Sequence, residues 1–156
     1  MKRLFLLLMV PIICLFVVGC SSTESPDIPD NTYENLVIKD LEYNKDTKTI
    51  TFKTENKGNE DVITGLYYTI EKYDEKNKWE KTNLTDDLAF IQIALIIEPG
   101  KTIDEKIDLS MVNIADNGKY RIVKEYNVGK ENVNQYIQFE VDGSIVDLNT
   151  YNSIEP

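Results

Sequence analysis

The sequence predicts an all-β domain, and two patterns in it support that fold class. From Glu34 onward, apolar and polar residues alternate in short runs, which is the period of a half-buried β-strand. Asn, Asp, Gly or Pro interrupts these runs at intervals of about eight to fifteen residues, as turns do between the strands of all-β folds. The 156 residues allow one such domain with an appendage, and they contain no internal repeat and no stretch that requires a long helix.

The first half of the domain supplies four of the expected strands. We expect them over residues 36–43, 50–54 and 66–73, and from Trp79 onward. In the third strand, alternation places Tyr68 and Ile70 on one face and Tyr67 on the other. The polar segment 74–78 is the expected hairpin tip between the third and fourth strands.

Beyond residue 34, the most apolar stretch is Leu88–Ile97, which has no charged residue and is apolar on both faces of a strand. One sheet cannot bury both faces, so we expect the tail or a neighbouring segment to cover the second face. The alternative is a partner surface that extends a sheet edge. The remaining strands are expected over residues 103–109, 120–125 and 137–141. Residues 143–156 are expected to form a surface tail, with Ile145, Val146 and Leu148 pairing with a sheet edge as the alternative.

Residues 1–19 predict a cleaved export signal. Lys2 and Arg3 give it a positive start. The apolar run Leu4–Val18 that follows is shorter than the roughly 20 residues needed to cross a bilayer. The tetrad Val17–Cys20 then resembles the lipobox of bacterial lipoproteins.

The lipobox resemblance implies that the Cys20 thiol receives a diacylglyceryl group and that the signal is cut just before it. Because two or more acyl chains give stable anchoring, we expect the chain at the extracytoplasmic face of the cell membrane, bound through this lipid. Residues 20–33 are polar and rich in Ser, Asp and Pro, which predicts a disordered tether. The alternatives are an uncleaved anchor and an ordinary signal peptide with an incidental cysteine.

Cysteine usage and charge limit the partners of the exported part. The other cysteine, Cys14, leaves with the signal, so we expect no disulfide in the domain. Without Lys2 and Arg3, 15 basic residues remain against 27 acidic ones, and the formal charge falls from −10 to −12. An acidic chain does not neutralise phosphates, so we expect no nucleic-acid partner and no help from surface charge at an anionic membrane.

The segment Asp116–Tyr120 has the pattern D-x-G-x-Y and looks like the corner before strand F of an immunoglobulin-type sandwich. In that corner the Tyr hydroxyl bonds to the backbone a few residues upstream and Gly allows the bend, which gives Asp116, Gly118 and Tyr120 a structural role. With the runs GKYRIVKE, TITFKTENKGNE, YYTIEKYD and IIEPGKT, the pattern resembles the bacterial Ig-like domain of small exported lipoproteins from Gram-positive bacteria. The resemblance covers residues 34–141.

This resemblance implies a Greek-key immunoglobulin-like β-sandwich of about seven to eight strands over residues 34–142. It implies no reaction, because members of the family carry no agreed catalytic residues. Where antibody domains place a cysteine pair between the sheets, this chain has Phe52 and Ile122. We therefore expect an apolar contact in place of the disulfide.

The composition also excludes several chemistries. The chain has no His, which excludes Ser-His-Asp and Cys-His nucleophile systems and His-ligated metals. Its acidic residues do not follow the EF-hand spacing, and the groups at Asp86–Asp87, Asp104–Glu105 and Asp108 are expected to form a solvated acidic face. We therefore expect no enzyme activity, no metal and no cofactor.

Trp79, Tyr67 and Tyr73 are the candidate ligand contacts, because exposed aromatic side chains can stack on a sugar or a peptide. The alternative is that Trp79 covers the rim of the core. These observations predict a non-catalytic, lipid-anchored binding or interaction module of the bacterial cell envelope, with a protein or glycan partner. The other hypothesis is an exported inhibitor or sensor accessory of a cell-envelope hydrolase that acts through residues 74–87.

Overall fold

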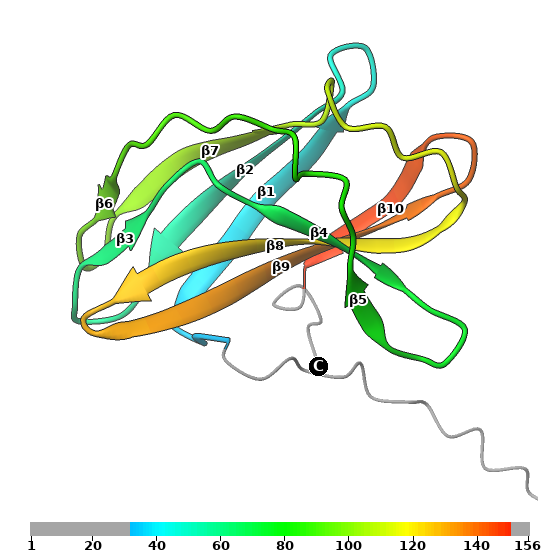
Figure 1. Cartoon of the computed structure of the whole chain (residues 1–156). Helices are drawn as coiled ribbons and strands as arrows, with labels where there is room; N and C mark the ends of the chain where they lie inside the picture. Colours follow the sequence, from blue (N-terminus) through cyan, green and yellow to red (C-terminus); the bar gives the residue numbers. More distant parts are fainter. Residues whose placement is uncertain (1–31, 151–156) are drawn as a thin grey trace, which may run out of the picture.

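The computed structural model describes residues 32–150, apart from the side chain of Val146 (Figure 1). The predicted signal, Cys20 and almost all of the predicted tether lie outside the described residues. Within them the structure has ten strands and no helix, and therefore no helix that could cross a membrane. The strands are β1 Leu36–Asn44, β2 Thr49–Asn56, β3 Val62–Thr64, β4 Thr69–Tyr73, β5 Trp79–Lys81, β6 Leu95–Ile97, β7 Thr102–Asp108, β8 Gly118–Val128, β9 Glu131–Val141 and β10 Ile145–Thr150.

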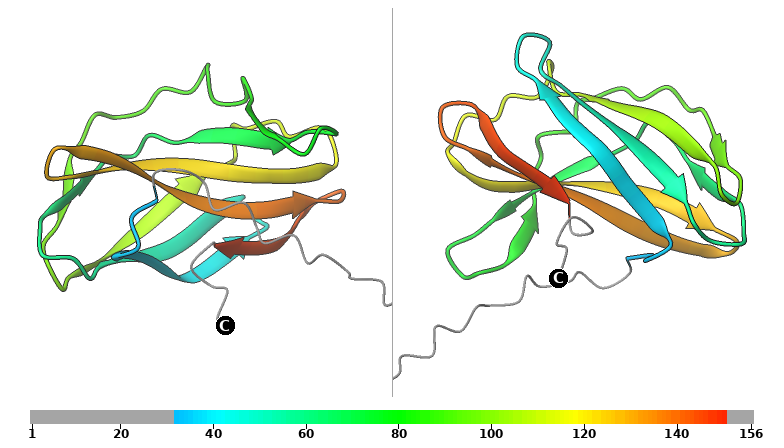
Figure 2. Two further views of the ribbon diagram at one scale, coloured as in Figure 1. Left: turned by 90° about the horizontal axis from the view of Figure 1, so that it is seen from below. Right: turned by 180° about the vertical axis from the view of Figure 1, so that it is seen from behind.

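The strands form two antiparallel sheets that lie face to face as separate layers (Figure 2). The smaller sheet has the order β1-β2-β7, and the larger has the order β10-β9-β8-β3-β6. In the larger sheet β8 pairs with β3 near its end and with β4 near its beginning, and β5 extends β4. The chain passes between the sheets after β2, β6 and β7, so each layer is built from segments far apart in sequence. The predicted all-β sandwich is confirmed.

The core consists of two apolar clusters between the sheets. The larger cluster includes Phe52 of β2 and Ile122 of β8, which are 2% and 0% exposed. Their positions match the apolar contact expected in place of a disulfide. The smaller cluster, at the end where β1 begins, contains Leu36, Val62 and Ile97.

The third expected strand begins later than predicted, and residues 65–68 separate it from a further short strand. It was predicted to run from residue 66, but β4 begins at Thr69, and a separate three-residue strand, β3, precedes it. The break follows from a close contact at Gly65, where a Cβ would lie 3.2 Å from the carbonyl oxygen of Ile93. Glycine at this position lets the two segments approach without crowding, and β3 and β4 pair with different parts of β8.

The prediction of a covered strand over Leu88–Ile97 is wrong. Only Leu95–Ile97 form a strand, β6, while residues 88–94 follow an irregular path from β5 toward it. The reason is the packing of Phe90, whose ring contacts those of Tyr67 and Tyr68 at centroid distances of 5.2 and 5.3 Å. This contact turns Phe90 toward the core and leaves the isoleucines beside it exposed.

The expected surface tail begins with a strand instead. Residues 145–150 form β10, which pairs with β9 in antiparallel register from Ile145 opposite Val141 to Thr150 opposite Ile137. The alternative of edge pairing is therefore the one observed. β10 also contacts β1, so it closes one side of the sandwich, and the domain boundary predicted at residue 142 falls inside a hairpin.

Candidate functional site

Tyr120 forms a corner between the loop after β7 and the start of β8. Its hydroxyl donates a hydrogen bond to the carbonyl oxygen of Asp116 at 3.0 Å, and Gly118 has a φ of 141°, in the region that favours glycine. The Tyr120 ring is 2% exposed and stacks on Phe139 with a centroid distance of 5.7 Å. With its hydroxyl bonded to the backbone and its ring buried, Tyr120 supports the corner of the fold.

Trp79 and Tyr73, two of the three predicted ligand contacts, lie together on the hairpin of β4 and β5. Their ring centroids are 5.0 Å apart. The guanidinium carbon of Arg121, on β8, lies 4.5 Å from the Trp79 ring centroid and 4.4 Å from that of Tyr136, on β9. Arg121 also donates from Nε to Glu71 Oε2 at 2.6 Å. The cation therefore connects three neighbouring strands and covers one face of the indole.

Sequence reasoning missed Arg121 and Tyr136 because their roles depend on strand pairing. Arg121 lies opposite Glu71 across β4 and β8, and Tyr136 comes from β9. A shallow pocket of about 200 Å³ adjoins Trp79, lined also by Lys119, Gln138, Glu140 and Asn149 among others. Trp79 and Tyr73 remain predictions as ligand contacts, and of the two Trp79 lines this pocket.

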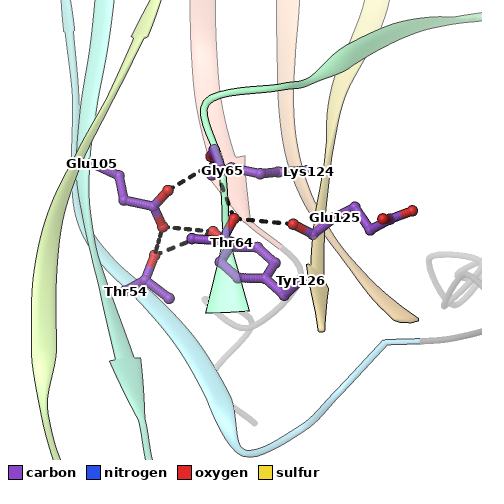
Figure 3. A network of polar contacts seen from close by, with 7 residues as sticks. All are labelled: Thr54, Thr64, Gly65, Glu105, Lys124, Glu125 and Tyr126. Carbon is purple, nitrogen blue, oxygen red and sulfur yellow. Dashed lines mark hydrogen bonds and ion pairs between the residues drawn. The ribbon is translucent and has the colours of Figure 1, made fainter. Parts of the chain in front are cut away.

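A buried polar network joins the two sheets (Figure 3). Lys124 Nζ, from β8, lies 3.0 Å from Glu105 Oε2, from β7, and both side chains are less than 5% exposed. The hydroxyls of Tyr126 and Thr54 donate to Glu105 Oε1 at 2.7 and 2.5 Å. Lys124 Nζ also donates to the carbonyl oxygen of Gly65 at 2.5 Å. The network therefore holds one strand of the small sheet against the long central strand of the large one.

The charged and hydroxyl groups of the network are buried and already hydrogen-bonded to one another, so they are not accessible to a substrate. Burial, and next the charge of Glu105, raises the pKa of Tyr126 well above its ordinary value, so its phenol stays protonated and donates. Throughout residues 32–150, every buried side-chain nitrogen or oxygen has a hydrogen-bond partner. With both charges paired and enclosed, the network works as a structural link between the sheets.

Glu105 corrects one expectation, since it was placed on a solvated acidic face with Asp104. In β7, Glu105 shares the inner face with Ile107, while Asp104 and Lys106 point outward. In β8, Lys124 shares the inner face with Ile122 and Tyr126. A single charge on each of two apolar strand faces, opposite in sign, was the sequence signal for this pair.

The third predicted contact, Tyr67, lies on a different surface, which we call the apolar edge surface. It consists of six large apolar side chains with exposed fractions between 37% for Leu66 and 72% for Ile91. Its members are Ile63, Leu66, Tyr67, Ile91, Ile93 and Ile96. Elsewhere in the described chain, Met111 is the exposed large apolar residue.

The apolar edge surface is continuous because its two segments, 63–67 and 90–96, run side by side. Ile63 pairs with Ile96 across β3 and β6, Gly65 touches the Ile93 carbonyl, and Tyr67 contacts Phe90. Within the described residues β6 pairs with β3 on one side only, so the surface follows a sheet edge. It lies toward the opposite end of the sandwich from β5 and Trp79 (Figure 1).

The fold and the corner define the class of this protein. Two antiparallel sheets packed face to face, with a tyrosine corner before the long strand β8, form an immunoglobulin-like β-sandwich. A family model described as a bacterial Ig-like domain matches residues 31–140, and the chain belongs to this family. The predicted resemblance to a bacterial Ig-like domain is thus confirmed, and domains of this family are typically non-catalytic. No curated protein matches the chain in sequence.

Breaking the buried pair is expected to destabilise the domain more than removing it. Glu105→Gln leaves the Lys124 ammonium without its counter-charge, which should cost about 3–5 kcal/mol of unfolding free energy. The double variant Glu105→Gln with Lys124→Met removes both charges and keeps an amide oxygen that can accept from Tyr126 and Thr54, so it should be closer to the parent than Glu105→Gln. Urea unfolding followed by Trp79 fluorescence measures both. Equal stability of the parent and Glu105→Gln would contradict the role of the pair.

Alkaline pH is expected to destabilise the fold through its buried phenols. Burial, and next the charge of Asp108, raises the pKa of Tyr68 from 10.0 to about 12, and the pKa of Tyr126 is also raised. The folded chain therefore holds these protons to higher pH than the unfolded chain. The stability that the two buried phenols contribute to the folded chain is fully present below pH 10.0 and is lost as the pH rises through about 12.

The measurement is the urea midpoint as a function of pH above neutrality. It should fall more steeply with pH in the parent than in Tyr126→Phe, which has one fewer buried phenol. Tyr67→Phe, which alters an exposed ring, should keep the slope of the parent. Parallel curves for the parent and Tyr126→Phe would show that the phenol of Tyr126 does not control alkaline stability.

Proposed function

We propose that this chain is a non-catalytic interaction module, held by lipid on Cys20 at the extracytoplasmic face of the bacterial cell membrane. The observation that carries the interaction role is the apolar edge surface, because large contiguous apolar patches on a protein surface often mark interaction sites. The non-catalytic role is supported by the family, by the absence of histidine and by the buried network, whose polar groups are all hydrogen-bonded. The anchor is supported by the apolar signal and the Val17–Cys20 motif.

The proposed anchor fits the position at which the chain enters the domain. β1 starts at Leu36, which packs in the same cluster as Val62 and Ile97. The tether therefore enters at the end of the sandwich that carries β3 and β6. Its residues, 20–33, reach at most about 50 Å when fully extended, so the apolar edge surface would meet its partner close to the membrane.

Removal of the lipid acceptor is expected to release the protein. Cys20→Ala leaves no thiol for acylation, so this variant should move from the membrane fraction to the soluble envelope or medium fraction. Ser21→Ala, a neighbouring change that keeps the thiol, should fractionate like the parent. Immunoblots of the separated fractions measure the distribution. A Cys20→Ala variant that stays with membranes as fully as the parent would refute the lipid anchor.

A second candidate function, inhibition or sensing of a cell-envelope hydrolase, is favoured by the hairpin of β4 and β5. This hairpin projects from the body of the sandwich (Figure 1). Its tip is organised by Asp74, whose Oδ1 accepts hydrogen bonds from the backbone N–H groups of Lys76 and Lys78 at 2.9 and 2.8 Å. Asn77 at the tip has a φ of 60°. A preorganised projecting turn suits insertion into the cleft of an enzyme.

This second candidate predicts that the purified chain slows peptidoglycan digestion by a hydrolase of the same envelope. Asp74→Ala loosens the tip and should weaken the inhibition, whereas Glu42→Ala, at an exposed position of β1, should not. The rate of turbidity loss of a cell-wall suspension measures the effect. Digestion rates that stay the same with and without the chain, for every envelope hydrolase of the cell, would eliminate inhibition as the function.

A further inference from the structure

The charged residues nearest in sequence to the apolar edge surface are acidic. Its two segments, 63–67 and 90–96, contain no charged residue. Within three positions of either segment along the chain, the charged residues are Glu60, Asp61, Asp87 and Glu98. All four are acidic and exposed.

The strand beside β3 continues this acidic border. Ile63 lies opposite Asn127 of β8, and Glu125, two residues earlier on the same face of β8, is exposed. The cation nearest in the strand, Lys124, points to the other face and is buried against Glu105.

Exposed Lys101 lies beside Glu98, to whose carbonyl oxygen its backbone N–H donates at 3.0 Å, and exposed Lys130 follows Gly129, which the Glu60 carboxylate approaches. The border of the apolar centre is therefore mainly acidic.

This charge pattern favours some binding partners for the apolar edge surface over others. Two copies of the chain meeting through this surface would bring their acidic borders together, which is unfavourable. An anionic bilayer would be repelled in the same way. A partner with basic residues around an apolar centre would gain both apolar burial and opposite charge.

The surface is also preformed. Phe90, which lies beneath it, packs on Tyr67 and Tyr68, and Gly65 holds the two segments at close contact through the Ile93 carbonyl. The same Gly65 accepts a hydrogen bond from the buried Lys124. Docking on a surface supported in this way requires little ordering of the chain, and ordering is one of the main costs of binding.

We propose that the apolar edge surface docks a polypeptide segment whose apolar side chains are flanked by Lys or Arg. This inference rests on the proposed interaction role and names the chemistry of the partner. The apolar side chains of the segment cover Ile91, Ile93 and Ile96, and its cations face the acidic border. The contact lies along β6, at the edge of the large sheet.

The test uses the chain from residue 20 to 156 with Cys20→Ala, which keeps all ten strands and both core clusters. The probe is a labelled synthetic peptide of leucines flanked by lysines, and fluorescence anisotropy at low ionic strength measures its affinity. Ile91→Ser with Ile96→Ser should weaken binding about tenfold or more, because the contact loses two apolar side chains. Met111→Ser, which removes an exposed apolar residue elsewhere, should bind like the parent. Neither variant changes the net charge.

Two further probes complete the experiment. A peptide with glutamates in place of the lysines should not bind, and vesicles of phosphatidylglycerol should not retain the chain. Equal affinity of all variants, or equal binding of the two peptides, would overturn the proposal. So would retention by the vesicles, which would indicate a lipid surface. A dimer in sedimentation that Ile91→Ser with Ile96→Ser dissociates would also overturn it, because the occupant would then be a second copy.

Failure of this proposal is distinguishable from failure of the anchor. Peptide affinity is measured on a chain without lipid, so it does not depend on Cys20. Fractionation of Cys20→Ala, in turn, does not depend on the isoleucines of β6 and the segment before it. Each result therefore bears on one of the two hypotheses.

Discussion

The ion pair between Lys124 and Glu105 is the contact on which the arrangement of the two sheets depends. It lies among apolar residues, at the place where a strand of the small sheet faces the central strand of the large one. A buried charge is costly unless its partner is in position, so this pair disfavours any packing in which β7 and β8 are displaced. Tyr126, Thr54 and the Gly65 carbonyl occupy further hydrogen-bonding positions of the two charged groups. Because Gly65 also contacts the segment before β6, the same network supports the surface above it.

Much of the fold could be predicted from the sequence, because long strands with one buried face carry a clear period of two. β1, β2, β7, β8 and β9 were all expected, and the D-x-G-x-Y pattern indicated a corner at Tyr120. The short strand β3 was not expected, and β6 was expected only as the end of a longer strand, because so short a segment shows little period and its pairing is set by distant residues. β10 was ambiguous for a related reason, since only its pairing with β9 distinguishes it from a tail.

The candidate site was less predictable, because it depends on contacts across strands. Trp79 and Tyr73 could be grouped from their proximity in sequence, but Tyr67 belongs to another surface once Phe90 is placed beside it. The clamp of Arg121 between two aromatic rings requires the register of three strands. The buried pair was different, because a lone charge on each of two apolar faces was present in the sequence, at Glu105 and Lys124. Charged residues at inward-facing strand positions therefore indicate how the two sheets are linked, as the missing cysteines do.

The absence of cysteine from the sandwich affects how the protein matures. In a disulfide-linked sandwich, the connection between sheets requires an oxidant and an enzyme that directs thiol pairing. Here the connection consists of an ammonium, a carboxylate and hydroxyl groups of the chain's own side chains, and forming it requires no oxidant. The domain can therefore complete its fold whatever the redox potential of the compartment in which it folds. The same property allows it to be produced in a reducing cytoplasm, and thiol reductants leave its core intact.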